Sequence, residues 1–171
     1  LVSDLLEISR IEAGTYEIHL DFIPIAPIVE RTVDSVEQLA GEKNLTIHCD
    51  VPQGLSAWAD AEALEHVLLN LVDNACKYTP AGGEVKVRAR AEGERVRIEV
   101  EDNGPGIEPR HRARIFERFY RIDKGRSREV GGTGLGLAIV KHLAEAMDAT
   151  VGVEAAKPQG SVFSVTLTGA A

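Results

Sequence analysis

The stretch LLNLVDNACKYTP, residues 68–80, combines a helical apolar repeat with two asparagines one turn apart. At about 100° per residue the polar side chains Asn70, Asn74 and Lys77 share a wedge of roughly 60°. The pattern predicts a helix over about residues 61–79, with Asp60 as its N-cap. Its opposite, apolar face consists of Leu64, Val67, Leu68, Leu71, Val72 and Ala75.

Asparagine is a poor choice inside a helix, because its amide competes for backbone hydrogen bonds. A solvated face would explain the wedge from its pattern alone, but Glu or Lys would make a better exposed helix. A site for an anionic ligand with a metal is the functional alternative. An amide oxygen can coordinate Mg²⁺ without adding charge, and a lysine can bind a phosphate.

A second motif, VRIEVEDNGPGI, covers residues 96–107. The period of two in a strand places Asp102 on the same side of the sheet as Val96, Ile98 and Val100. A carboxylate at the end of an apolar face needs a donor, and the exocyclic amine of an adenine would serve. Turn formation by the residues after Asp102 is the simpler explanation of this motif.

Two further motifs follow in order. FERFYR, residues 116–121, is aromatic and fits either a corner of the core or a functional site. The segment from Arg121 to Gly132 is basic and has no apolar periodicity. A solvated loop or a lid over phosphates would fit that segment. GGTGLGLAIV, residues 131–140, opens a helix with glycines, whose bare backbone N–H groups favour an anion. Its spacing matches neither a Rossmann fingerprint nor a Walker A motif.

The rest of the chain predicts a mixed α+β domain. Helices are expected at residues 1–14, from Pro27 to Ala40 with Gly41 ending it, and at residues 135–147. Strands are expected at residues 45–51, in a hairpin over residues 82–102, and at residues 150–155 and 161–168. Because helices and strands do not alternate strictly, the order favours a mixed or antiparallel sheet with helices on one face.

The order of NLVDNACKYTP, DNGPGI, FERFYR and GGTGLGLAIVK resembles the N, G1, F and G2 boxes of sensor histidine kinases. These share the Bergerat fold with gyrase, MutL and the ninety-kilodalton heat-shock chaperone. The resemblance covers about residues 1–167 and is nearest to phosphate-responsive and related envelope sensor kinases. It implies a two-layer α/β sandwich with a mixed sheet of about five strands and helices on one face.

The resemblance also implies site residues for ATP and Mg²⁺. Asn74 would hold Mg²⁺, Asn70 and Lys77 would lie at the phosphate end, and Tyr78 near the nucleotide. Asp102 would accept from the adenine amine, and Arg121 would lie near the transferred phosphate. The remaining residues would shape the base pocket (Gly104, Gly106, Ile107), wrap the phosphates (Gly132, Thr133, Gly134, Leu135, Gly136, Leu137) or help to hold the adenine (Ser161).

Two departures from the family pattern stand out. Where the family often ends a helix with His-Gly-Gly, this chain has Met147-Asp148-Ala149. The acceptor motif, a histidine followed by an acidic residue, is absent, since none of His19, His48, His66, His111 or His142 matches it. The phosphate acceptor is therefore expected outside this chain.

The resemblance divides the chain into three parts. Residues 1–14 are expected to end the second helix of a dimerisation and phosphotransfer domain, residues 15–25 to be a linker, and residues 26–171 to be the catalytic ATP-binding domain. The chain is expected to be a piece of a longer, homodimeric protein that passes phosphate to a response regulator. We expect the cytoplasmic portion of a membrane-anchored sensor, with no membrane contact by this fragment.

Composition excludes several classes. The chain of 171 residues has 44% hydrophobic and 27% charged residues, as expected for a globular domain. A formal net charge of -8 argues against nucleic acid as a partner, since that binding needs clustered Lys and Arg. Cys49 and Cys76 lack the spacing of a metal or redox motif, so buried or inert thiols are expected.

Three other functions are alternatives to a histidine kinase. Hydrolysing relatives resemble this site but carry a Glu that activates water where this chain has Asn70, and a neutral amide is a poor general base. A non-catalytic ATP-binding switch is disfavoured because all four boxes are intact. A serine kinase of the anti-sigma type lacks a dimerisation helix, which the opening LVSDLLEISRIEAG resembles.

Overall fold

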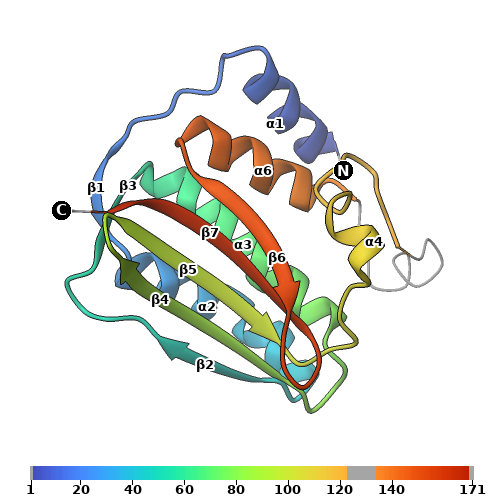
Figure 1. The fold of residues 1–171 in the computed structure, drawn as a ribbon. Coiled ribbons are helices and arrows are strands. Elements are labelled where there is room, and N and C mark those ends of the chain that lie inside the picture. The colour runs from blue at the N-terminus through green and yellow to red at the C-terminus, as the bar shows by residue number, and fades with distance from the viewer. Residues whose placement is uncertain (1, 123–133, 170–171) are drawn as a thin grey trace.

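The computed structural model describes residues 2–122 and 134–169 and has two layers, a sheet and a set of helices (Figure 1). The mixed α+β fold is confirmed. The helices are α1 (Val2–Glu12), α2 (Ala26–Glu42), α3 (Ala61–Tyr78), the short α4 (Pro109–Arg112) and α6 (Gly136–Ala146). The strands are β1 (Asp21–Pro24), β2 (Thr46–Asp50), β3 (Ser56–Ala59), β4 (Glu84–Glu92), β5 (Arg95–Asp102), β6 (Thr150–Ala155) and β7 (Ser161–Gly169).

The sheet is mixed, in the order β1-β3-β7-β5-β4-β2, with β6 also paired to β7. The β2–β4 pair is parallel and every other pair is antiparallel. Over the described residues the sheet has seven strands rather than about five. The two additional strands, β1 and β3, have four residues each and pair with one another, so neither carries enough alternation to be recognised from sequence. β1 lies within residues 15–25, which were expected to form a linker.

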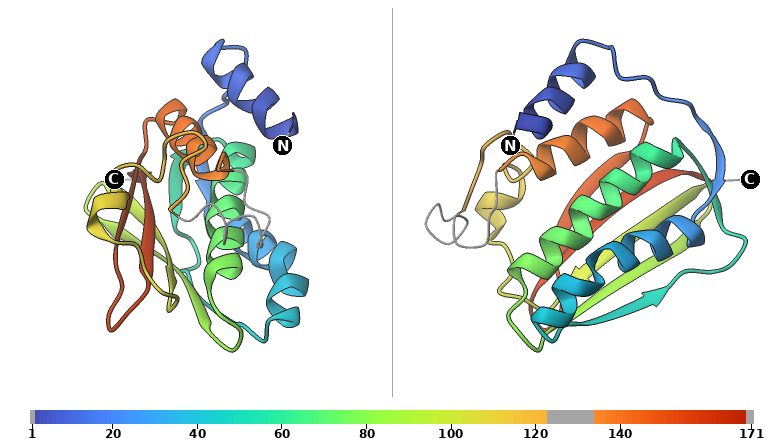
Figure 2. Two further views of the ribbon diagram at one scale, coloured as in Figure 1. Left: turned by 90° about the vertical axis from the view of Figure 1, so that its right-hand side faces the viewer. Right: turned by 180° about the vertical axis from the view of Figure 1, so that it is seen from behind.

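Three helices, α2, α3 and α6, cover one face of the sheet (Figure 2). The predicted apolar face of α3 is confirmed, since its members are all buried against the sheet and the neighbouring helices. On β5, the side chains of Val96, Ile98, Val100 and Asp102 are buried, as the period of two predicted. The packing of α3 on the sheet therefore fixes the position of its polar residues Asn70, Asn74 and Lys77 relative to the end of β5.

The helix α1 lies outside this layer, beside α6 (Figure 1). Ile8 anchors it in the core with 2% exposure, and Glu7 pairs with His66 of α3 at 2.7 Å. Glu12 forms a second ion pair, with Arg118 of the FERFYR motif. Leu5 and Leu6 of the same helix remain exposed.

Helix ends follow local chemistry. Asp60 caps α3, accepting from the Ala63 amide at 2.8 Å, as predicted. The predicted end of α2 at Gly41 is wrong: the helix continues to Glu42, and Asn44 (φ 53°) takes the left-handed conformation that turns the chain. After α6, Asp148 adopts φ 55° where the family often has glycine, so the turn is formed by a tolerated left-handed aspartate.

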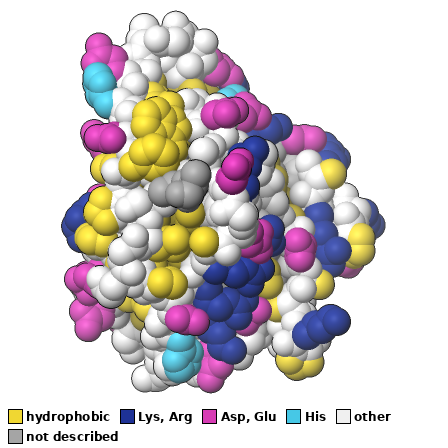
Figure 3. All heavy atoms as spheres, turned by 60° about the vertical axis from the view of Figure 1, so that its left-hand side comes forward, with side chains coloured by type: hydrophobic (Ala, Val, Ile, Leu, Met, Phe, Trp, Pro, Cys, Tyr) yellow, Lys and Arg dark blue, Asp and Glu magenta, His cyan; other side chains and the backbone are white. Residues whose placement is uncertain are grey.

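The outer face of the sheet carries charged side chains in pairs. Figure 3 shows Lys and Arg gathered beside Asp and Glu on one face of the molecule. Glu99, only 6% exposed, forms ion pairs with Arg88, Arg90 and Arg97. These arginines therefore neutralise carboxylates of the same sheet.

The two thiols differ in exposure. Cys76 is buried, and burial raises its pKa to about 11. Cys49 is exposed on β2, although in the sequence it alternates with the apolar residues Ile47 and Val51, because β2 is an edge strand. Burial of part of the Cys49 side chain raises the pKa of its thiol, which lowers its thiolate fraction. Among the described helices, none is both long and apolar enough to cross a membrane.

Candidate functional site

The predicted site residues lie on α3, at the ends of β5 and β7, and at the start of α6. Asn70, Asn74, Lys77 and Tyr78 are half-buried on α3. Asp102 ends β5 and Ser161 begins β7, and the two are partners in the sheet. The other described members follow β5 (Gly104, Gly106, Ile107), follow the FERFYR motif (Arg121) or begin α6 (Gly134, Leu135, Gly136, Leu137).

Asn70 lies where α3 meets α6. A Cβ atom added to Gly136 would stand 3.6 Å from Asn70 Oδ1, so the two helices approach closely here. The Asn70 Nδ2 atom is buried and has no hydrogen-bond partner among the described residues. A buried donor costs free energy when unpaired, so this amide has a hydrogen-bonding capacity that the described residues leave unused. The solvated-face explanation of the wedge therefore fails at Asn70.

Lys77 lies one helical turn from Asp73, and the two form an ion pair of 3.0 Å. About a third of each side chain is exposed, so the pair contributes little stability. An anion near α3 would compete with Asp73 for this ammonium. Lys77 is thus held on α3 by a partly exposed ion pair with Asp73.

Asp102 is 8% exposed at the end of β5. Its Oδ1 atom accepts from the Gly104 amide at 3.0 Å. Burial raises the pKa of Asp102, while hydrogen bonds from the Gly104 and Ser161 backbones oppose that rise. A buried carboxylate that stays ionised needs more donors than these, which a ligand amine can supply.

The turn after Asp102 forms only because glycines let backbones cross. A Cβ atom at Gly160 would lie 1.8 Å from the Asp102 carbonyl oxygen, so no other residue fits there. Gly106 has φ 81°, and a Cβ atom there would stand 3.1 Å from the Gly160 carbonyl oxygen. Gly160 was not predicted as part of this arrangement, because its contact with the end of β5 joins distant parts of the chain and leaves no signal in the sequence.

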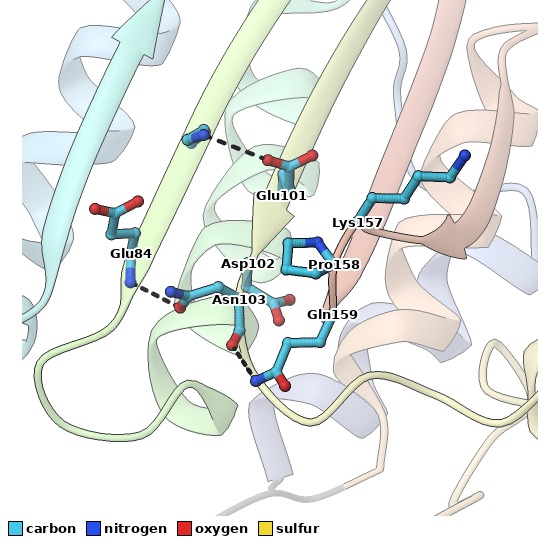
Figure 4. Close-up of a pocket in the computed structure, with 8 residues that line it drawn as sticks. Glu84, Glu101, Asp102, Asn103, Lys157, Pro158 and Gln159 are labelled. Atoms are coloured by element: carbon cyan, nitrogen blue, oxygen red, sulfur yellow. Dashed lines mark hydrogen bonds and ion pairs between the residues drawn. The ribbon is translucent and has the colours of Figure 1, made fainter.

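Asn103 ties the same turn to two other segments (Figure 4). Its Oδ1 atom accepts from the Glu84 amide at 2.8 Å, and its carbonyl accepts from Gln159 Nε2 at 3.1 Å. A small cavity of about 160 Å³ lies beside it. Glu101 and Asp102 both line that cavity, although as neighbours on β5 their side chains lie on opposite faces of the strand, so the cavity adjoins the site at Asp102.

The FERFYR motif divides between core and site. Phe116 packs edge-on against Phe163, as a core corner would. Phe119 is 55% exposed with φ 60°, and its amide donates to the Gly134 carbonyl at 2.8 Å. This bond attaches the motif to the start of the glycine segment. Of the predicted lid, only Arg121 and Ile122 are among the described residues. The predicted site residues Gly132 and Thr133 also lie outside the described residues.

Comparison with known proteins finds similar sequences over nearly the whole chain. Residues 59–170 match the family model described as histidine kinase-, DNA gyrase B- and HSP90-like ATPase. The sensor-like histidine kinase SenX3 of Mycobacterium tuberculosis is 37% identical over 98% of this chain, and WalK of Bacillus subtilis is 34% identical over 98%. The chain spans 41% and 28% of these two relatives.

Solved structures give the same result. Full-length ShkA in complex with AMPPNP has a TM-score of 0.86 and 37% identity, covering 99% of this chain and 35% of that one. The mycobacterial sensor histidine kinase MprB has a TM-score of 0.77 and 29% identity, covering 88% of this chain and 98% of that one. The similarity therefore extends over the α1 segment in the first case.

Proposed function

Because this chain belongs to the family of histidine kinase-, DNA gyrase B- and HSP90-like ATPases, we propose that it is the part of a sensor histidine kinase that binds Mg²⁺-ATP and transfers its γ-phosphoryl group. The acceptor is a histidine of a dimerisation domain outside residues 1–171. The phosphate then passes to a response regulator. The whole protein acts as a homodimer, with this chain in the cytoplasmic portion of a membrane-anchored sensor.

The observation that carries the proposal is the buried Asn70 amide beside the first turn of α6. Phosphate oxygens would satisfy this donor, and the start of α6 adds backbone N–H groups and the positive end of its dipole. Lys77, at the C-terminal end of the same helix, supplies positive charge. Residues 132–137 wrap the phosphates, and Arg121 lies near the group that is transferred.

The adenine is proposed to bind at the end of the site opposite to the phosphates. Asp102 accepts from the exocyclic amine, and Ser161, its partner on β7, helps to hold the base. Gly104, Gly106 and Ile107 shape the pocket, with Tyr78 beside it. A charged acceptor for a single amine gives selectivity for adenine, because a base with a carbonyl there would leave the carboxylate unpaired.

The donor set fits Mg²⁺. Asn74 offers a neutral amide oxygen on the same face of α3 as Asn70, and Mg²⁺ is usually held by few protein ligands together with phosphates and water. When bound, Mg²⁺ neutralises the phosphate charge. The protein's own residues position the nucleotide, and the neutral Asn70 does not activate water as a Glu would.

In the proposed transfer, an imidazole nitrogen of the acceptor histidine forms a bond to the γ-phosphorus while the bond to the bridging oxygen breaks and ADP leaves. Purified chain with labelled ATP and Mg²⁺ should bind nucleotide and stay unlabelled. Added dimerisation domain carrying the upstream histidine should gain an acid-labile, alkali-stable phosphate. Its rate should rise with concentration, since two separate pieces lack the effective molarity of a tether. Stoichiometric label on any of the five histidines of this chain alone would contradict the proposal.

A further inference from the structure

The helix α3 ends without the left-handed residue that closes many helices. The last four carbonyl groups of a helix have no partner within it, and a left-handed residue, usually glycine, often brings amides back to them. Here the C-cap residue Thr79 is extended, with φ -82° and ψ 127°, and Pro80 follows. Because proline has no amide hydrogen, this end cannot close in the usual way.

Lys43 closes it from outside. Its Nζ atom donates to the carbonyls of Cys76 at 2.8 Å and Lys77 at 3.0 Å. The carbonyl of Ala75 accepts hydrogen bonds from both the amide and the hydroxyl group of Thr79. A positive charge at this position also complements the negative end of the helix dipole. The end of α3 therefore depends on a residue more than thirty positions earlier in the chain.

The packing of α2 on α3 brings Lys43 to this position. The two helices lie side by side and end at the same edge of the domain (Figure 2). Lys43 is the C-cap of α2, and the left-handed Asn44 then turns the chain toward β2. The Lys43 carbonyl also accepts from the Gly82 amide at 2.9 Å, so it holds the loop after α3 as well.

The extended exit from α3 has a consequence for the site. A Cβ atom at Gly104 would stand 3.2 Å from the Tyr78 carbonyl oxygen, so the end of α3 lies directly against the turn after β5. The Gly104 amide in that turn donates to Asp102. A helix end that curled back on itself would not present Tyr78 to this turn.

We propose that Lys43 is a positioning residue of the nucleotide site. Its ammonium caps α3 and thereby holds Lys77 and Tyr78 in register with the turn that carries Asp102. Lys43 itself touches no nucleotide and acts through the carbonyls of Cys76 and Lys77. This inference rests on the proposed function of the Asp102 site, but the capping role can be measured without nucleotide.

The test compares Lys43→Met, which keeps the aliphatic stem but loses the donor, with Lys43→Arg, which keeps a cation able to donate to both carbonyls. Val96→Ala, at the far end of β5 from Asp102, is the control for general loss of stability. Amide hydrogen exchange of residues 76–79 is measured in nucleotide-free protein. Calorimetry then gives the Kd for Mg²⁺-ADP.

Lys43→Met should speed exchange at residues 76–79 and weaken Mg²⁺-ADP binding about tenfold, the effect of a partly buried helix-terminal cation. Lys43→Arg should restore both values to within about threefold, and Val96→Ala should change neither, although it lowers the unfolding midpoint. Unchanged exchange in Lys43→Met would refute the cap. Faster exchange with unchanged Kd would refute the positioning role. Absence of nucleotide binding by the unaltered chain would refute the proposed function instead, leaving the exchange result to decide the cap.

Discussion

Replacing Asp102 with Asn tests the adenine end of the site most directly. The change keeps the size of the side chain and removes its charge at a position only 8% exposed. The remaining amide oxygen can still accept from the Gly104 amide, but the new NH₂ group faces an adenine amine that also donates. The variant therefore loses a charged acceptor and gains an unmatched buried donor.

The magnitude follows from these two changes. A hydrogen bond to a charged group contributes about 1.5–3 kcal/mol, and about 1.4 kcal/mol is a tenfold change in affinity. Asp102→Asn should therefore weaken ATP and ADP binding roughly 10- to 150-fold. The fold should persist, because burial already penalises the ionised carboxylate in the empty protein, as the raised pKa of Asp102 indicates.

Isothermal calorimetry with Mg²⁺-ADP measures the change, and urea unfolding checks the fold. Glu101→Gln is the matched control, since Glu101 is the neighbour of Asp102 on β5 but pairs with Lys86 and Arg88 on the outer face. The control should bind nucleotide normally. An unchanged Kd in Asp102→Asn, with Glu101→Gln also unchanged, would remove Asp102 from the site.

Four further outcomes are expected. Asn70→Glu should raise slow ATP hydrolysis if the variant still binds Mg²⁺-ATP, because a carboxylate can activate water; nucleotide binding without any gain in phosphate release would point to exclusion of water by geometry. Gly160→Ala should destabilise the fold by about 2 kcal/mol or more in urea unfolding, since its methyl group would collide with the Asp102 carbonyl, whereas Gly41→Ala inside α2, where space is open, should stabilise it by about 1 kcal/mol. Because burial raises the pKa of Asp102, this carboxyl binds its proton more tightly in the folded state, so its contribution to stability is present at low pH and lost as pH rises through the folded pKa; a free energy of unfolding with the same pH slope in Asp102→Asn and unaltered protein would contradict this.

Much of the candidate site could be found from local sequence because each part is a short motif with its own chemistry. The polar wedge on α3, the carboxylate at the end of β5 and the glycines before α6 each follow from a helical or strand period or from turn residues. Their order along the chain identified the family. The roles of the individual residues stay predictions.

Other parts could not be found because they depend on contacts between distant segments. β1 and β3 exist as strands because β1 pairs with β3 and β3 pairs with β7, not because of their own pattern. Cys49 alternates like a buried residue, but β2 lies at the edge of the sheet, where the strand is mostly exposed. In each case the environment is set by the position of the strand in the sheet.

The sequence by itself determined the helix that carries Asn70, Asn74 and Lys77, and the strand that ends at Asp102, because hydrophobic periodicity and capping act over a few residues. Only the tertiary structure decided that the Asn70 amide nitrogen is buried where α3 meets α6, that Gly160 lies against Asp102, and that Lys43 caps α3. These contacts join residues far apart in the chain, and their energies come from packing and from satisfying buried polar groups. These contacts form only when α2, α3 and the sheet are packed together.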